Sequence, residues 1–403
     1  MKCRFSEKEI PTIVNFGKMP LANGFLHEKI DNEYFFEMSV AVNCDLGLMQ
    51  LVEQPNPKKM FHQDYAFFTR TSNFMIKHFN DVANEICSFL DNQFINDKSK
   101  FVVEIGSNDG VMLENLVNKN INCLGIEPSE NVAKTSNKYG VRTLNEFFSF
   151  DLSNEVISNY QAANIIYAAN VFCHISDIND LAKACANLLK DGGLLVFEDP
   201  YLGDVLQKTS YDQIYDEHVF IFSCHSVKSI FGKYGLSLID CKPLKTHGGS
   251  MRYYLIKDNN RPITQNLRFQ LDFEISMGLL SLDAYKNFAE KCEFSKKEFK
   301  KIIEKYKNQN LKVVGYGATS KSTTILNYCN IGPELIDFIV DTTPIKQGKL
   351  TPGKHIPVKD YSKFIPHPDI SVLFAWNHKK EIMEKERDYK GKWITHLYND
   401  LKK

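Results

Sequence analysis

Apolar positions along the 403-residue chain fall into runs with two different spacings. Between about residues 101 and 255, short apolar runs alternate with amphipathic stretches of helical spacing, and the runs read FVVEIG, CLGIEP, IIYAANV, GGLLVFEDP, SLIDCKPL and MRYYLIK. Short strands separated by helices at this rhythm predict a mostly parallel, doubly wound α/β sheet. We expect the last strands of this sheet to be antiparallel.

The segments on either side of this unit have different patterns. Residues 1–75 contain short strand-like pieces and no long helical period, which predicts a small irregular domain of loops and hairpins. Apolar spacing from about residue 75 to 97 predicts a helix that opens the central domain, residues 76–257. Charged, periodic residues 258–310 predict long connecting helices, and a second α/β pattern over residues 311–403 predicts a Rossmann-like domain.

Composition limits the possible partners. The chain carries 49 basic and 49 acidic side chains, so the whole molecule has no electrostatic attraction for nucleic acid or for an anionic membrane. It has no apolar run of about 20 residues and no apolar signal-peptide core at its start. Ten scattered cysteines suggest buried thiols. We expect a cytoplasmic monomer that acts on a small ligand.

The segment VVEIGSNDG places Glu104 at the end of a strand and two glycines, Gly106 and Gly110, before a helix. Asn108 stands where the dinucleotide fingerprint has its second glycine, which favours an adenosine ligand without a diphosphate. Glu127 ends the next strand 23 residues on (127 − 104), close to the spacing of a carboxylate that binds ribose hydroxyls. The pattern predicts an S-adenosylmethionine pocket; the alternative is a glycine turn beside two surface acids.

In this pocket we expect Glu104 near the amino-acid tail or sulfonium of the cofactor, Glu127 on the ribose, and Phe147 or Phe148 beside the adenine. The predicted cofactor-binding residues are Glu104, Gly106, Asn108, Asp109, Gly110, Glu127, Pro128, Asn131, Phe148 and Asn170.

A dense polar segment, EDPYLGDVLQKTSYDQIYDEH, follows the carboxyl end of a strand, where open α/β sheets bind ligands. Its His218 titrates near neutral pH and is the candidate general base. Tyr215 and Glu217 are placed to orient that ring, and His174 follows the neighbouring strand. The competing interpretation is a surface histidine in a helical turn.

Two further glycine segments suggest anion binding. THGGSMRYYL supplies His247 and Arg252 at a junction between loop and strand, where a plain hairpin turn is equally compatible. In VVGYGATSKS, backbone donors at a helix start, Thr319 and Lys321 form a candidate anion cradle. The pattern of this second loop fits a diphosphate or an NAD molecule and does not separate them.

Several long motifs together resemble a known family. VVEIGSNDG, GIEP, IYAANVFCHI, FEDPYLGDVLQKTSYDQIYDEH, HGG-MRY, VVGYGATSKS, DTTP-KQ-LTPG-HIPV and LFAWNH are similar to the nucleotide-sugar C-methyltransferases of deoxysugar biosynthesis. Within that family the chain most resembles the TDP-sugar C-3-methyltransferases of tetronitrose biosynthesis. The resemblance implies a class I S-adenosylmethionine methyltransferase domain between a small N-terminal domain and a C-terminal domain that helps to hold a nucleotide sugar.

The resemblance also implies a reaction. Its substrate is a nucleotide-linked 4-keto sugar, from which His218 removes the C3 hydrogen, and the enolate carbon attacks the methyl group. Tyr215, His174, Asn170 or His247 would donate a hydrogen bond to the enolate oxygen. The predicted substrate-binding residues are Tyr65, Asn170, His247, Arg252, Tyr316, Thr319 and Lys321.

This sequence departs from the family in two places. The family's N-terminal domain has two CxxC pairs, whereas here Cys3 is followed by Ser6 at the second position and Cys44 stands alone. Two thiolates do not complete a four-coordinate site, so we predict that zinc is absent and that the chain holds no metal. Phe67 also replaces a tyrosine, although Tyr65 remains, which leaves the exact sugar open.

Three rival functions remain at this stage. A sugar O-methyltransferase would use the same cofactor pocket. An NAD-dependent nucleotide-sugar oxidoreductase would rely on the GYGATS loop. A binding module derived from a former zinc protein would keep the fold without the chemistry, which the complete cofactor and base motifs argue against.

Overall fold

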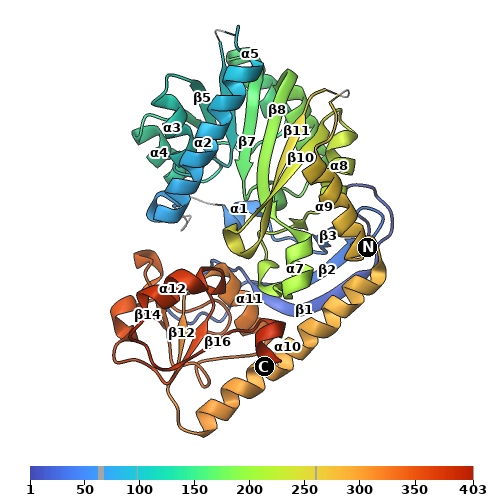
Figure 1. Cartoon of the computed structure of the whole chain (residues 1–403). Coiled ribbons are helices and arrows are strands. Elements are labelled where there is room, and N and C mark those ends of the chain that lie inside the picture. The colour runs from blue at the N-terminus through green and yellow to red at the C-terminus, as the bar shows by residue number, and fades with distance from the viewer. Residues whose placement is uncertain (62–67, 98, 259–260, 403) are drawn as a thin grey trace.

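The central part of the molecule is a seven-stranded sheet (Figure 1). The computed structural model describes residues 1–61, 68–97, 99–258 and 261–402. The strand order is β10-β11-β8-β7-β4-β5-β6, with β4 to β8 parallel and β10 and β11 antiparallel, which confirms the predicted doubly wound sheet. Its strands are β4 Phe101–Ile105, β5 Asn122–Ile126, β6 Thr143–Leu144, β7 Ala163–Ala169, β8 Leu189–Pro200, β10 Ser237–Leu244 and β11 Ser250–Ile256.

Helices cover both faces of this sheet. On one face, α2 and α3 share a core with the strands, and α2 begins where the Ser72 side chain accepts a hydrogen bond from the Met75 N–H. The opposite core includes buried residues of α5, α6 and α8. The helices are α2 Asn73–Gln93, α3 Val111–Val117, α4 Glu130–Lys138, α5 Phe150–Asn159, α6 Ile178–Leu188, α7 Leu202–Lys208 and α8 Cys224–Gly232.

A smaller antiparallel sheet joins the N-terminal segment to the central one. Its order is β1-β2-β3-β9, with β1 Thr12–Pro20, β2 Phe35–Asn43, β3 Leu48–Leu51 and β9 Phe220–Ile221. β9 lies two residues after His218, and Phe220 is in register with Gln50 of β3. The predicted hairpins are present, and this pairing fixes the chain just after the candidate base. The single helical turn α1, Pro57–Met60, comes after β3 in the sequence.

Hydrogen bonds tie the first residues to this sheet. The buried Gln50 accepts from the Arg4 N–H at 3.0 Å and donates to the Lys2 carbonyl at 3.2 Å. Asn43, next to Cys44, donates to the Ser6 hydroxyl at 3.2 Å. Among the residues described, no group of three metal-ligating side chains contains Cys3 or Cys44. The absence of zinc stays a prediction.

The C-terminal part forms a parallel five-stranded sheet of order β14-β13-β12-β15-β16, which confirms the predicted second open sheet. Helices α9 Gln265–Ser276 and α10 Leu282–Asn308 connect it to the central sheet, as predicted, and α10 runs along one side of the molecule (Figure 1). The predicted domain limits stay predictions. The elements are β12 Val313–Tyr316, β13 Ile339–Asp341, β14 Val358–Asp360, β15 Ile370–Leu373, β16 Lys392–Ile394, α11 Ser320–Tyr328, α12 Lys379–Lys385 and α13 Tyr398–Leu401.

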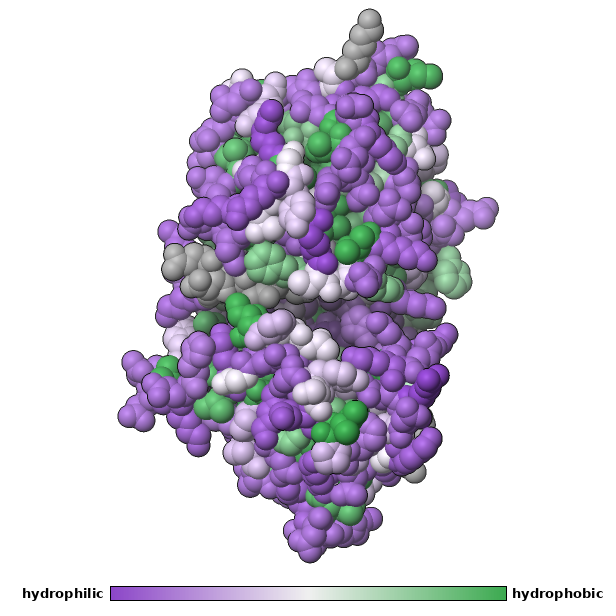
Figure 2. Space-filling model, turned by 90° about the vertical axis from the view of Figure 1, so that its left-hand side faces the viewer, coloured by the Kyte–Doolittle hydropathy of each residue, from purple (hydrophilic) through white to green (hydrophobic). Residues whose placement is uncertain are grey.

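The two larger sheets form an upper and a lower lobe, and β1 and β2 lie near the lobe junction (Figure 1). Figure 2 shows a waist across the middle of one face of the molecule, where the lobes meet. Over the described ranges, no helix has both the length and the apolar character to cross a membrane.

Asp212 is the central polar contact between the lobes. Its carboxylate is fully buried and accepts hydrogen bonds from Trp376 Nε1 at 2.6 Å and from His396 Nε2 at 3.0 Å. Burial alone would raise the pKa of Asp212, but His396, Lys321 and Trp376 together lower it. An ionised acid of the upper lobe therefore holds two rings of the lower lobe.

We predict that Asp212→Ala lowers the free energy of unfolding by about 3 kcal/mol, because it leaves buried donors without an acceptor. Urea unfolding followed by circular dichroism measures this loss. As a control, Asp45→Ala removes an exposed pair with Lys8 and is expected to cost less than about 1 kcal/mol. Equal midpoints for the two variants would contradict the assigned contact.

Candidate active site

The first glycine loop is shaped by close packing. Gly106 has φ +67°, and a Cβ on it would lie 2.3 Å from Val171 Cγ2. Gly110 has φ +78°, and its Cβ would lie 2.4 Å from Ser136 Oγ. Larger residues are therefore excluded at both positions. The loop after β4 consequently sits against the end of β7, next to Asn170.

Three buried acids meet at this loop. Glu104, Asp109 and Glu127 are each at most 5% exposed. Glu127 accepts from the Asn108 N–H at 3.0 Å and from the Ser129 N–H at 2.8 Å. Burial raises the pKa of Glu104 well above its usual value, and the nearby Asp109 and Glu127 add to the rise.

Several polar atoms around these acids lack a hydrogen-bond partner within the described ranges. They are Glu104 Oε2, Ser107 Oγ, Asp109 Oδ1, Ser129 Oγ and Asn170 Oδ1. Buried acceptors without partners are costly unless a ligand supplies donors. An ammonium group and ribose hydroxyls supply such donors, and the acids suit the positive charge of a sulfonium, so the residues present suit S-adenosylmethionine.

Other predicted cofactor residues serve the loop itself. Asn108 Oδ1 accepts from the Thr69 N–H and Asp109 Oδ2 from the Arg70 N–H, both at 3.0 Å. Pro128 and Asn131 lie at the start of α4. Phe148 is buried in the central core, whereas Phe147 is 42% exposed. Asn145, which the sequence reading missed, donates to the carbonyls of Glu127 and Pro128.

His218 is held by both ring nitrogens. Nδ1 lies 2.6 Å from the Gln213 carbonyl and Nε2 lies 2.7 Å from the Tyr215 hydroxyl. A carbonyl only accepts, so Nδ1 carries the hydrogen and Nε2 presents a lone pair to Tyr215. Burial, then His174, lowers the pKa of His218 well below its usual value. The ring is therefore neutral at pH 7 and has the protonation state of a base.

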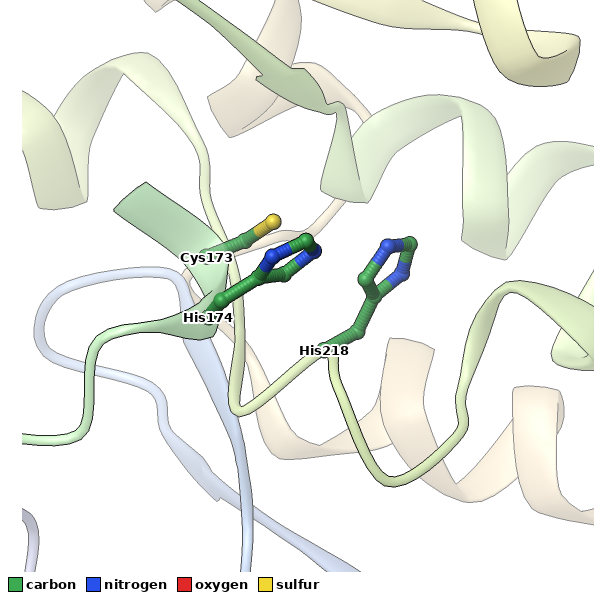
Figure 3. A group of neighbouring side chains, drawn as sticks. All are labelled: Cys173, His174 and His218. Carbon is green, nitrogen blue, oxygen red and sulfur yellow. The ribbon is translucent and has the colours of Figure 1, made fainter. Parts of the chain in front are cut away.

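His174 stacks on His218 with ring centroids 5.3 Å apart (Figure 3). Its other face contacts Phe61, and its Nε2 is buried with no partner in the chain as described. Burial, with a contribution from His247, lowers the pKa of His174 to about 3. The buried Asp199 shapes the turn that carries His174, because it accepts from the N–H groups of Val171 and Cys173 at 3.1 Å.

Cys173, His174 and His218 also have possible metal-ligand atoms within 4.8 Å of one another (Figure 3). Two features disfavour a metal there. Burial and the nearby Asp199 raise the pKa of the Cys173 thiol, which keeps it protonated. Both His218 nitrogens are already hydrogen-bonded, so an ion would have to displace Tyr215. The predicted absence of a metal stays a prediction.

The second glycine loop reaches the same region from the lower lobe. Thr319 caps α11, and the buried Lys321 Nζ donates to the His247 carbonyl at 2.5 Å. Burial lowers the pKa of Lys321 to about 8, against the opposing effect of Asp212. His247 lies in the short turn Thr246–Gly248 that precedes β11. The structure thus brings together the two predicted anion-binding segments.

Two predicted substrate residues have other partners, and one lies outside the described ranges. The Arg252 guanidinium bonds Glu198 at 2.7 Å and Glu85 at 2.6 Å, so its donors stabilise the central sheet. Tyr316 donates to Glu386 at 2.8 Å and packs against Phe364. The polar groups of Arg252 and Tyr316 are therefore engaged within the chain. Tyr65 falls in the undescribed segment 62–67.

Cavity size alone does not locate the site. A cavity of about 740 Å³ lies at the edge of the lower sheet near Trp393 and contains none of the predicted residues. A cavity of about 420 Å³ lies between the β10–β11 hairpin and Trp376, and its wall includes Lys208 and Gly248. Lys208 donates to the Gly248 carbonyl at 2.7 Å. This smaller cavity adjoins the His247 turn.

Comparison with known proteins identifies the class. A family profile described as a methyltransferase domain matches residues 76–240, and one described as a C-methyltransferase C-terminal domain matches residues 245–397. Together with the buried acids at the glycine loop, these matches make the chain an S-adenosylmethionine-dependent methyltransferase of class I. Its C-terminal part is similar to the C-methyltransferases, since the second profile is specific to them.

A named relative supports this assignment. The C-methyltransferase NovU of Streptomyces niveus is 29% identical over 381 residues, covering 94% of this chain and 90% of NovU. Among solved structures, magnesium protoporphyrin IX methyltransferase of Synechocystis with bound S-adenosylmethionine covers 50% of this chain and 89% of its own, at 11% identity and a TM-score of 0.34. A putative sarcosine dimethylglycine methyltransferase of Galdieria sulphuraria covers 44% and 86%, at 13% identity and a TM-score of 0.36.

We predict that the affinity for S-adenosylmethionine falls as the pH falls, because protonation of Glu104 removes a negative charge that faces a cationic ligand. Glu104→Gln should lower the affinity about 10-fold to 100-fold at pH 8 and flatten its pH dependence. Isothermal titration calorimetry between pH 6 and 9 measures both effects.

The matched control is Glu114→Gln, which changes a carboxylate paired with Arg70. It should retain the wild-type pH dependence. A pH-independent affinity in the wild-type protein would remove Glu104 from cofactor binding.

Proposed function

We propose that this chain transfers a methyl group to C3 of a nucleotide-linked 4-keto sugar, with His218 as the general base. The observation that carries the proposal is the buried His218 ring, with Nδ1 against the Gln213 carbonyl and Nε2 against the Tyr215 hydroxyl, stacked on His174. The similarity to a named C-methyltransferase supports reaction at carbon. Carbon is a poor nucleophile until a proton is lost, so such a reaction requires a base.

The ketone at C4 makes the C3 hydrogen acidic. In the proposed step, Nε2 of His218 takes this proton, and the electron pair of the C–H bond becomes the enolate. The Gln213 carbonyl accepts from Nδ1 throughout and stabilises the imidazolium that forms. A positioned base contributes about 10²–10⁴ in rate.

Tyr215 has two roles in this scheme. In the free enzyme its hydroxyl lies against Nε2 of His218. When the substrate carbon takes that place, the hydroxyl is released to donate to the C4 oxygen, where negative charge develops. A donor aimed at such an oxygen contributes about 3–4 kcal/mol. The Nε2 of His174 is a second candidate donor.

S-adenosylmethionine, when bound, supplies an electrophilic methyl group on sulfur. The chain's own residues would place the enolate carbon before it: the Glu104 side of the pocket holds the cofactor, and His218 stacks on His174, which follows the end of β7 as Asn170 does. Orientation of this kind is worth about 7–11 kcal/mol of barrier. Positioning therefore contributes more than the base itself.

The nucleotide part of the substrate requires an anion site in the lower lobe. Thr319 begins α11, whose N-terminal N–H groups favour an anion, and Lys321 adds a cation. The His247 turn, which accepts from Lys321, would close the other side. We propose that these segments hold the diphosphate while the sugar reaches His218.

We predict that His218→Asn lowers turnover about 10²-fold to 10⁴-fold and leaves S-adenosylmethionine affinity unchanged. Formation of S-adenosylhomocysteine with a panel of nucleotide 4-keto sugars measures turnover. In D₂O without methyl donor, the wild-type enzyme should exchange the substrate C3 hydrogen, and the variant should not.

The control is His225→Asn, which removes an imidazole bonded to Glu274 on α8 and should exchange normally. Methyl transfer to an oxygen without C3 exchange would instead support a sugar O-methyltransferase.

We predict that Tyr215→Phe lowers kcat about 10²-fold to 10³-fold with little change in KM, because the lost donor acts on charge that appears in the transition state. Steady-state kinetics on the accepted sugar provide both constants. An unchanged kcat would assign enolate stabilisation to another donor, with His174→Asn as the next variant to measure.

A further inference from the structure

A turn of the N-terminal sheet, residues 21–24, is inserted between the two lobes. It follows β1 directly. The Ala22 N–H donates to Asp216 of the upper lobe at 3.0 Å, and the Ala22 carbonyl accepts from Thr323 of the lower lobe at 2.9 Å. Backbone groups of the turn therefore contact both lobes.

The Asn23 side chain projects from this turn to Glu217, the residue before His218. Its Nδ2 donates to Glu217 Oε1 at 2.7 Å, and its Oδ1 accepts from Ser320 Oγ at 2.9 Å. An ionised carboxylate has only acceptors, so the amino end of the amide must face Glu217 and the oxygen must face Ser320. Asn23 thus links the acid beside the base to the start of α11.

We propose that Asn23 is the positioning residue for Glu217, so that a side chain of the N-terminal segment completes the methyltransferase site. The proposal deepens the proposed function and rests on it for the sugar that Glu217 would bind. Through Asn23, the Glu217 carboxylate is held ionised and in one orientation. It then serves as the acceptor for an ammonium or hydroxyl group of the sugar.

The surroundings of Glu217 make its charge sensitive to this contact. Burial raises the pKa of Glu217 to about 7, while the hydrogen bond from Asn23 and the charge of Lys346 lower it. Among the described residues, Asp216 and Cys173 are further titratable groups that interact with it. Lys346 is itself anchored to the Ala318 carbonyl at 2.8 Å. Because the pKa of Glu217 lies near neutral pH, the loss of one hydrogen-bond donor changes the fraction of Glu217 that is ionised.

Asn23 joins three distant parts of the chain. Glu217 lies 194 positions from Asn23, and Ser320 lies 297 positions away. A hydrophobic residue at position 23 would leave a buried carboxylate without its donor, which favours the protonated acid. Such a change would remove the hydrogen bonds to Glu217 and Ser320 and would raise the pKa of Glu217.

The decisive experiment is an infrared titration of the full-length protein with S-adenosylhomocysteine and without sugar. The carboxylic-acid band that disappears in Glu217→Gln reports protonation of Glu217. Asn23→Asp places a carboxylate where the donor was, and we expect the pKa of Glu217 to rise by about one unit or more. Asn23→Ala should shift it in the same direction.

The kinetic counterpart uses the accepted sugar. The acid limb of the kcat profile should move to higher pH in Asn23→Asp by the same shift as the infrared band. The matched control is Asn43→Asp, which alters another buried asparagine of the N-terminal sheet that bonds Ser6, and it should leave both titrations at the wild-type pH.

The outcomes separate the two levels of the proposal. An unshifted Glu217 band in folded Asn23→Asp and Asn23→Ala overturns the role of Asn23, whatever the enzyme methylates. A shifted band together with no methylation of any keto sugar supports Asn23 and rejects the proposed substrate. If Asn23→Asp does not fold, Asn23→Ala decides by the same band.

Discussion

The hydrogen bond between His218 Nδ1 and the Gln213 carbonyl is the contact on which the chemistry depends. It fixes which nitrogen carries the hydrogen, and burial keeps the other nitrogen unprotonated. The remaining structure keeps this ring in place. β9 pairs with β3 immediately after His218, and Asp212, next to Gln213, holds Trp376 and His396 of the lower lobe.

The site uses one physical device repeatedly: a buried polar group whose charge is controlled by contacts from another part of the chain. Glu104 is buried with two other acids and is ready for a cationic ligand. Glu217 sits near neutrality between Asn23 and Lys346. Lys321 is buried and donates to the His247 carbonyl of the upper lobe. Domain contact and catalysis are therefore coupled, because separating the lobes would alter the charges at the site.

Much of this architecture is predictable from the sequence because it depends on the spacing of apolar, polar and glycine residues within short segments. The alternating apolar runs predict both open sheets, and the density of polar groups after a strand end points to His218 and Tyr215. The ExGxxxG segment separates an adenosine pocket from a dinucleotide one. These inferences depend on residues that lie within about 25 positions of each other.

The rest depends on contacts between distant segments, which spacing does not encode. From the sequence, Arg252 resembles an anion-binding residue beside two glycines. In the structure it lies opposite Glu198 of the neighbouring strand β8 and forms an ion pair with it. Tyr316 follows a glycine, yet its ring turns toward Phe364. Asn23 gives no local signal at all, since its partners lie in two other parts of the chain. Asn145 and Asp199 form hydrogen bonds with backbone groups. Many polar residues in loops could do the same, so the sequence does not single these two out.

The most direct test is the state of the His218 ring itself, read by ¹⁵N NMR of histidine-labelled protein with His218→Asn used to assign its signals. The account predicts a neutral ring with the hydrogen on Nδ1 that persists from pH 8 down to pH 5.5. An imidazolium at pH 7, or a neutral ring with the hydrogen on Nε2, would contradict it.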